Sequence, residues 1–82
     1  MTVQARFSSN ELSGKLRDGA YELPEGATVA TLMEAAQNES SYILSDQQKS
    51  NCVYIFDNAP ASIETQLREG GKLRIMFKLL GG

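Results

Sequence analysis

The chain contains no histidine and only one cysteine, and these absences limit the chemistry that its side chains can perform. Histidine is the usual general base of Ser-His and Cys-His nucleophile pairs, so those catalytic arrangements are excluded. A zinc site is disfavoured too, because one cysteine and scattered carboxylates do not form a ligand cluster. The single thiol, Cys52, excludes an intrachain disulfide and favours a reducing compartment. We therefore predict that the chain is not itself an enzyme and binds no metal or cofactor.

Long apolar runs and basic stripes are absent as well. No stretch approaches the roughly 20 apolar residues that a membrane span requires, and the opening segment "MTVQARFSS" lacks the apolar core of a secretory signal. The formal net charge is −2 with both signs interspersed, which leaves no basic stripe to displace counterions from nucleic acid. We expect a cytoplasmic protein whose partners include neither nucleic acid nor a membrane.

The length and composition are those of one small globular domain. A chain of 82 residues has no room for a second core. Its hydrophobic fraction of 41% and charged fraction of 22% are ordinary for a folded protein. We expect residues 1–78 to form this domain and residues 79–82 to form a flexible tail.

The alternation of apolar and polar residues predicts four strands. They are "TVQARF", "AYELPEG" (ending at Pro24), "CVYIFD" and "KLRIMFKL". Asp18-Gly19 favours a tight turn, so the first two strands are expected to form an antiparallel hairpin. "CVYIFD", dense in β-branched and aromatic residues, is predicted to be covered on both faces. "NAPAS" is predicted to end it, and "SIETQLREGG" to form a loop or one helical turn.

One amphipathic helix is expected in "TVATLMEAAQNE". Thr28 is the predicted N-cap, and the helix is expected to end near Asn38 after about 10 residues. Its apolar stripe consists of Val29, Leu32, Met33 and Ala36. The sheet residues expected to cover this stripe are Val3, Ala5, Leu73, Ile75 and Phe77. With a short helical turn expected in residues 39–51, the pattern predicts an α+β domain of two layers.

The last predicted strand carries positive charge on one face. Lys72, Arg74 and Lys78 lie on that face together with Met76. One interpretation is a solvated outer sheet face whose lysines protect the edge. The other is a docking face for an acidic partner, because an adaptable apolar residue among charges is typical of interaction surfaces. For Cys52, at the start of an apolar strand, a packing role is favoured over reactivity.

The sequence closes with "LLGG", residues 79–82, directly after this strand. A frayed end is one interpretation. Alternatively, Gly81 and Gly82 lack side-chain bulk, so such a tail can enter a narrow active site of another protein. The main-chain carboxylate of Gly82 could then attack the α-phosphate of ATP held by that partner and become an acyl adenylate.

Two segments carry a resemblance to a known family. "VYIFDNAP" and "TQLREGGKLRIMFKLLGG" resemble the small sulfur-carrier proteins of the MoaD/ThiS family, which are relatives of ubiquitin. The resemblance implies a ubiquitin-like β-grasp fold, with a mixed four- to five-stranded sheet and one main helix packed across one face. The chain departs from the family at Glu69-Gly70-Gly71, where the usual turn is Asp-Gly-Asp, and at Leu79 and Leu80, where molybdopterin members often have prolines.

The role that the resemblance implies falls on the end of the chain. An E1-like adenylyltransferase would use ATP to adenylate Gly82, which would become a thiocarboxylate, with Gly81, Leu80 and Leu79 as the tail. The thiocarboxylate would donate sulfur in cofactor biosynthesis. The implied acceptor is the large subunit of molybdopterin synthase, with this chain as the small subunit, or next a thiazole synthase of thiamine biosynthesis. The length of 82 residues fits the molybdopterin branch better.

Docking of the activating partner is predicted on the outer sheet face at Arg74, Met76 and Lys78. Two other functions stay open. One is a ubiquitin-like modifier conjugated to lysines through Gly82, which would give higher-mass conjugates in a cell extract. The other is a β-grasp binding module without tail chemistry, which would keep its partner affinity after removal of Gly81 and Gly82.

Overall fold

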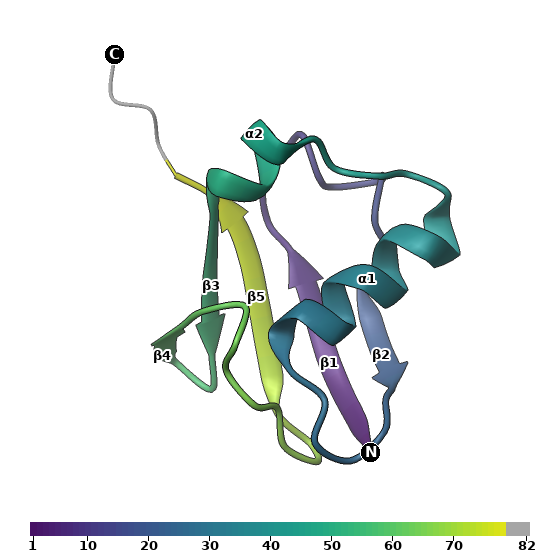
Figure 1. The fold of residues 1–82 in the computed structure, drawn as a ribbon, viewed down its shortest axis with the longest axis vertical. Coiled ribbons are helices and arrows are strands. Elements are labelled where there is room, and N and C mark those ends of the chain that lie inside the picture. Colours follow the sequence, from purple (N-terminus) through teal and green to yellow (C-terminus); the bar gives the residue numbers. More distant parts are fainter. Residues whose placement is uncertain (79–82) are drawn as a thin grey trace.

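The computed structural model describes residues 1–78, in which one long helix crosses one face of a sheet (Figure 1). The predicted tail, residues 79–82, lies outside the described residues. In chain order the elements are β1 (Thr2–Phe7), β2 (Gly19–Glu22), α1 (Val29–Ser40), α2 (Asp46–Ser50), β3 (Cys52–Phe56), β4 (Ala59–Ala61) and β5 (Lys72–Phe77). The short helical turn expected between the main helix and the third strand is therefore present as α2.

The sheet is mixed, with the strand order β2-β1-β5-β3-β4. β1 pairs antiparallel with β2, as the hairpin prediction required, and parallel with β5. β5 in turn pairs antiparallel with β3. The first and last strands of the chain therefore lie side by side at the centre of the sheet and run in the same direction (Figure 1).

The helix α1 begins where its sequence predicts. Thr28 is the N-cap: its side chain accepts a hydrogen bond from the backbone N–H of Thr31, whose hydroxyl accepts one from the N–H of Thr28. The helix runs two residues past the expected end at Asn38. It ends at Ser41, which has a φ of 54° and donates its N–H to the carbonyls of Asn38 and Gln37. This left-handed C-cap, which a non-glycine residue rarely provides, left no signal in the sequence.

Replacing Thr28 with alanine is expected to lower the free energy of unfolding by about 1 kcal/mol, because the first turn of α1 loses its side-chain acceptor. Chemical denaturation followed by circular dichroism measures the change. Thr28→Ser keeps the hydroxyl and serves as the matched control, with a smaller loss expected. Equal midpoints for the alanine variant and the parent chain would show that the cap contributes nothing.

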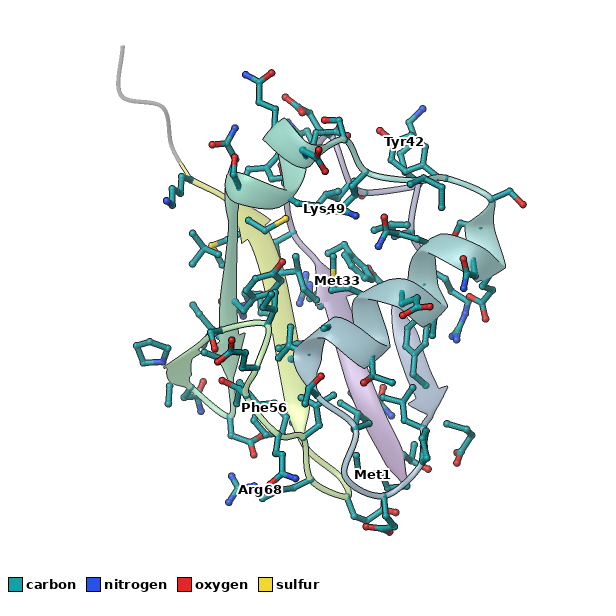
Figure 2. The ribbon with its side chains drawn as sticks, viewed as in Figure 1. Met1, Met33, Tyr42, Lys49, Phe56 and Arg68 are labelled. Carbon is teal, nitrogen blue, oxygen red and sulfur yellow. The ribbon has the colours of Figure 1, made fainter. Side chains whose placement is uncertain are left out.

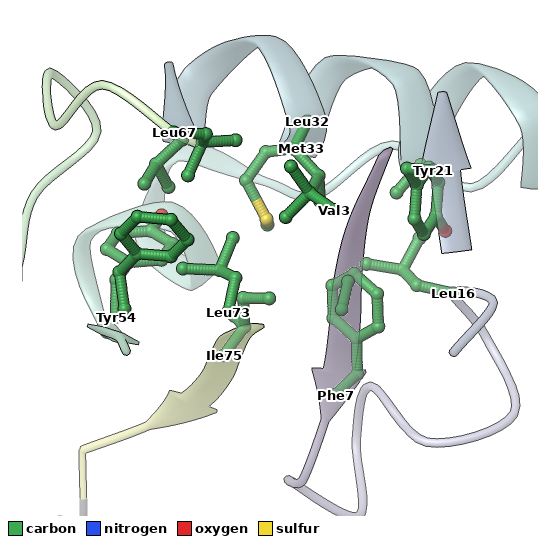
Figure 3. Close-up of a cluster of buried hydrophobic side chains, with 14 of the residues drawn as sticks. Val3, Phe7, Leu16, Tyr21, Leu32, Met33, Tyr54, Leu67, Leu73 and Ile75 are labelled. Atoms are coloured by element: carbon green, nitrogen blue, oxygen red, sulfur yellow. The ribbon is translucent and has the colours of Figure 1, made fainter. Parts of the chain in front are cut away.

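The core lies between α1 and the sheet. The predicted stripe Val29, Leu32, Met33 and Ala36 is buried, as are Val3, Ala5, Leu73 and Ile75, while Phe77 is partly buried against the same cluster. Figure 2 shows Met33 pointing from α1 toward the sheet, and Figure 3 shows Leu32 and Met33 meeting Val3 of β1 and Leu73 of β5. The predicted pairing of helix stripe and inward strand residues is thus confirmed.

The expectation that "CVYIFD" is covered on both faces was wrong. Cys52, Tyr54 and Phe56 are buried, but Val53 and Ile55 are only half-buried. The reason is that α1 covers one face of the sheet, so alternate residues of β3 lie on the opposite face. Those two apolar side chains become part of the molecular surface.

The strand β3 ends at Phe56, before "NAPAS", as predicted, but the sequence reasoning missed that the chain then turns back and forms β4 from Ala59 to Ala61. Asp57 and Asn58 have φ values of 50° and 67°, and these two left-handed residues form a tight hairpin turn. The pairing places Pro60 opposite Ile55. Proline is tolerated there because β4 is an edge strand. Of the alternatives for "SIETQLREGG", the structure has the loop.

Candidate functional site

The sheet face opposite α1, here called the outer face, carries the candidate site. It is formed by strand residues that alternate with the buried ones, namely Gln4, Arg6, Val53, Ile55, Pro60, Lys72, Arg74 and Met76. All of these residues are exposed or half-buried. The face is therefore a mixture of cations and apolar side chains.

Of the three residues predicted to dock a partner, Arg74 and Met76 lie on the outer face of β5, and Lys78 follows directly after the strand. Arg74 and Lys78 are exposed, and Met76 is half-buried. The β3–β5 register places Met76 opposite Val53 and Arg74 opposite Ile55. Two of the predicted docking residues therefore lie beside an apolar strip on β3 that consists of Val53 and Ile55. Their role in docking stays a prediction.

A hollow of about 630 Å³ lies on the outer face beside this strip. Its lining includes Arg6, Lys72, Arg74 and Ile55. Arg6 was missed by the sequence reasoning, which placed the basic residues on the last strand alone. The parallel β1–β5 register sets Arg6 opposite Arg74. The alternation in "TVQARF" puts Arg6 on a solvent face, but the neighbour across the sheet cannot be read from that segment.

Two carboxylates at the margins of the hollow are engaged with the backbone. Asp18 accepts a hydrogen bond from the N–H of Phe7 at 2.7 Å. Asp57 accepts one from the N–H of Lys72 at 2.9 Å and one from the Arg68 guanidinium at 2.8 Å. The bonds from Lys72 and then Arg68 hold the pKa of Asp57 below its ordinary value. Both acids thus fix turns at the rim of the sheet.

The thiol of Cys52 lies inside the core rather than at this site. It donates to the carbonyl oxygen of Gln48 at 3.4 Å, and burial raises its pKa. Burial also raises the pKa of the neighbouring Tyr54 hydroxyl. A thiol that stays protonated at neutral pH is a poor nucleophile, which agrees with the packing role expected from the sequence.

The end of β5 fixes where the chain leaves the sheet. Phe77 pairs with Cys52, and the N–H of Lys78 donates to the carbonyl oxygen of Asn51 at 2.8 Å. This exit lies beside α2 and the start of β3 (Figure 1). The four predicted tail residues, Leu79, Leu80, Gly81 and Gly82, follow and lie outside the described residues.

Within residues 1–78, no group of three or more histidine, cysteine or carboxylate side chains is arranged to hold a metal ion. None of the described helices has the length and apolar character of a membrane span.

The strand order, the parallel central pair and the single covering helix define the ubiquitin-like β-grasp fold, as predicted. The chain is similar over its whole length to SAMP1 from Haloferax volcanii, with a TM-score of 0.80, 12% identity and 100% of both chains covered. A second structure of this small archaeal modifier protein 1 gives a TM-score of 0.75 and 14% identity, covering 95% of this chain and 98% of the other.

A third similar structure is a Pyrococcus furiosus protein with the provisional name molybdopterin converting factor, subunit 1. It has a TM-score of 0.74 and 15% identity, covering 96% of this chain and 99% of the other. No family model and no curated protein matches the sequence. At these identities the likeness establishes the fold.

Proposed function

We propose that this chain is a sulfur-carrier protein that reacts through the main-chain carboxylate of Gly82. The observation that supports this most is the full-length similarity to two small β-grasp proteins, one named as a modifier and one as a molybdopterin converting factor subunit. The lack of histidine is compatible with this proposal, because the chain has no Ser-His or Cys-His pair of its own. The chain is a co-substrate in this scheme.

The proposed chemistry takes place on a partner enzyme. A carboxylate oxygen of Gly82 attacks the α-phosphorus of ATP bound to an E1-like adenylyltransferase, and pyrophosphate leaves. The resulting acyl adenylate is attacked at its carbonyl carbon by a sulfide-level donor, AMP leaves, and a thiocarboxylate remains. Its sulfur then passes to an acceptor, for which the large subunit of molybdopterin synthase is favoured over a thiazole synthase.

The folded domain holds the reacting group at a limited distance from the docking face. Four extended residues span at most about 14 Å, so Gly82 stays within that reach of Lys78. In this proposal the partner binds the face formed by Arg74, Met76 and Lys78, and its nucleotide site lies within that distance of Lys78. Docking on this face would make the attack of the Gly82 carboxylate on ATP effectively unimolecular, because both reactants would be held in one complex.

Incubation with ATP, the activating enzyme of the same organism and a sulfur donor is expected to increase the intact mass by about 16 Da, because one oxygen is replaced by sulfur. Intact-protein mass spectrometry measures this directly and also verifies that the starting chain ends at Gly82. A reaction without ATP is the control. An unchanged mass with every candidate activating enzyme would exclude the proposal.

Conjugation to other proteins is the second candidate, supported by the similarity to small archaeal modifier protein 1. The same acyl adenylate would end in an isopeptide bond to a lysine amine. Tagged protein in a cell extract would then appear in higher-mass conjugates, whereas a sulfur carrier alone would give none. If neither conjugates nor a thiocarboxylate form, the chain is a β-grasp binding module.

A further inference from the structure

A second hollow lies on the other side of the sheet, beside the two helices. It has a volume of about 510 Å³ and is here called the helix-side groove. Its lining comes from α1, α2, β3 and the loop between β4 and β5, and consists of the apolar residues Ala30, Met33, Tyr54 and Ile63 and the polar residues Glu34, Gln37, Lys49 and Ser50. Figure 2 shows Met33 on α1 and Lys49 beside α2. The groove therefore combines apolar surface with a few charges.

The apolar edge of the groove is held in place by the backbone. The side chain of Ile63 is 51% exposed. Its carbonyl oxygen accepts a hydrogen bond from the N–H of Ala30 at 3.0 Å, and the N–H of Val29 donates to the carbonyl oxygen of Thr65 at 3.0 Å. Because the first turn of α1 fixes this loop, the exposure of Ile63 is a feature of the fold. Apolar surface of this kind is suited to an apolar segment that covers it.

The two charges of the groove lie on different helices. Lys49 is exposed on α2, and Glu34 is exposed on α1. Among residues 1–78, neither of these side chains makes an ion pair. An added carboxylate is therefore favoured on the α2 side of the groove, near Lys49, and disfavoured near Glu34.

The chain leaves the sheet next to the α2 side of this groove. The N–H of Lys78 donates to the carbonyl oxygen of Asn51 at 2.8 Å. Asn51 directly follows Ser50, which lines the groove together with Lys49. Four extended residues reach about 14 Å from that point. These residues, 79–82, are two leucines and two glycines, so they bring apolar surface and the carboxylate of Gly82.

We propose that residues 79–82 dock in the helix-side groove of their own domain. Leu79 and Leu80 pack on its apolar lining. The carboxylate of Gly82 pairs with the ammonium group of Lys49. A docked carboxylate is withheld from a second protein, so a partner has to displace the tail before it can use Gly82. The docking rests on the groove and on the reach of the chain, and only its consequence for activation rests on the proposed function.

The docked state is expected to be only weakly favoured. An ion pair at an exposed lysine contributes little, and ordering four residues costs conformational entropy. The burial of two leucine side chains offsets this cost. Docked and free tails therefore coexist, which keeps Gly82 available to a partner. For the same reason, the denaturation midpoint of the domain is not expected to change measurably when the end of the chain is removed.

Nuclear magnetic resonance of the full chain tests docking without any partner. We expect nuclear Overhauser contacts between the methyl groups of the two tail leucines and those of Met33 or Ile63. The methyl signals of Met33 and Ile63 should also shift when residues 79–82 are removed. The methyl signals of Ile55, on the outer face, serve as the control and should stay in place. Unchanged signals of Met33 and Ile63 in the shortened chain would overturn the inference.

The accessibility of the chain end gives a second measurement. A carboxypeptidase of broad specificity removes the terminal residues, and intact mass follows the reaction. Lys49→Glu is expected to be digested about threefold faster than the parent chain, because the ion pair is replaced by repulsion. Glu34→Lys is expected to be digested about threefold more slowly, because a second cation then lines the groove.

Lys15→Glu is the matched control, with the same charge change as Lys49→Glu. The Lys15 ammonium lies over the ring of Tyr42, which Figure 2 shows on the side of α2 away from the end of β5. This variant should be digested at the rate of the parent chain. Equal digestion rates for the parent chain and all three variants would overturn the inference.

Two further results have distinct meanings. A digestion rate that falls with protein concentration, together with a dimer in analytical ultracentrifugation, would assign the groove to the tail of a second copy and overturn docking within one chain. Failure of thiocarboxylate formation would overturn the proposed function but not this inference, since the resonance and digestion measurements use the chain alone.

Discussion

Removing Gly81 and Gly82 is expected to abolish thiocarboxylate formation completely, because the shortened tail ends at Leu80. Its carboxylate would lie about 7 Å short of the position that Gly82 reaches, and it would carry a bulky neighbouring side chain into a narrow active site. Intact mass after incubation with the activating enzyme, ATP and a sulfur donor should show no gain for this variant. The parent chain should gain about 16 Da in the same reaction.

The deletion leaves the described domain, residues 1–78, with its full sequence. Its denaturation midpoint and its affinity for the activating enzyme are therefore expected to match those of the parent chain. A gain of about 16 Da on the truncated chain would contradict the role of Gly82. A gain of about 32 Da would instead indicate a persulfide on Cys52, the chain's single thiol.

Gly71→Ala is expected to lower the free energy of unfolding by about 3 kcal/mol, a large share of the stability of so small a domain. A Cβ at this position would overlap the Phe56 ring and lie 3.0 Å from the carbonyl oxygen of Arg68. Phe56 is buried at the end of β3 (Figure 2), so its ring cannot move aside cheaply. Chemical denaturation compared with the parent chain measures the loss.

Gly70→Ala is the matched control in the neighbouring residue. Gly70 has a φ of +75°, and nothing lies within 4 Å of an added Cβ. Only the left-handed backbone should resist the substitution, at a cost of about 1 kcal/mol. If Gly71→Ala costs no more than Gly70→Ala, the close approach of Phe56 is not what requires glycine at position 71.

This contact also explains one departure from the sulfur-carrier pattern. The Asp-Gly-Asp turn of those proteins is Glu69-Gly70-Gly71 here. With Phe56 against position 71, no side chain fits there. The first acid of the turn is kept, and Glu69 accepts a hydrogen bond from the N–H of Thr2. The turn thus still joins the start of β1 to the segment before β5.

Local patterns in the sequence were sufficient for most of the elements. The alternation in β1 and β5, the stripe of α1 and the Thr28 cap are properties of short segments, and each was predicted at its place. The hydrophobic periodicity of a segment indicates which of its faces is buried, and this does not require knowledge of the element that packs against it. The mixed sheet and single helix followed from these elements together with the resemblance to the sulfur carriers.

The tertiary structure decided which faces and side chains meet. The sequence alone determined that β3 is a strand, but the single helix decided that Val53 and Ile55 lie on the outer face. Likewise, the parallel pairing of β1 with β5 placed Arg6 beside Arg74, residues that are far apart in the chain. Burial and neighbouring charge across a sheet depend on strand order and register. Strand order and register depend on contacts between residues that are distant in the chain, and the hydrophobic periodicity of a short segment does not specify these contacts.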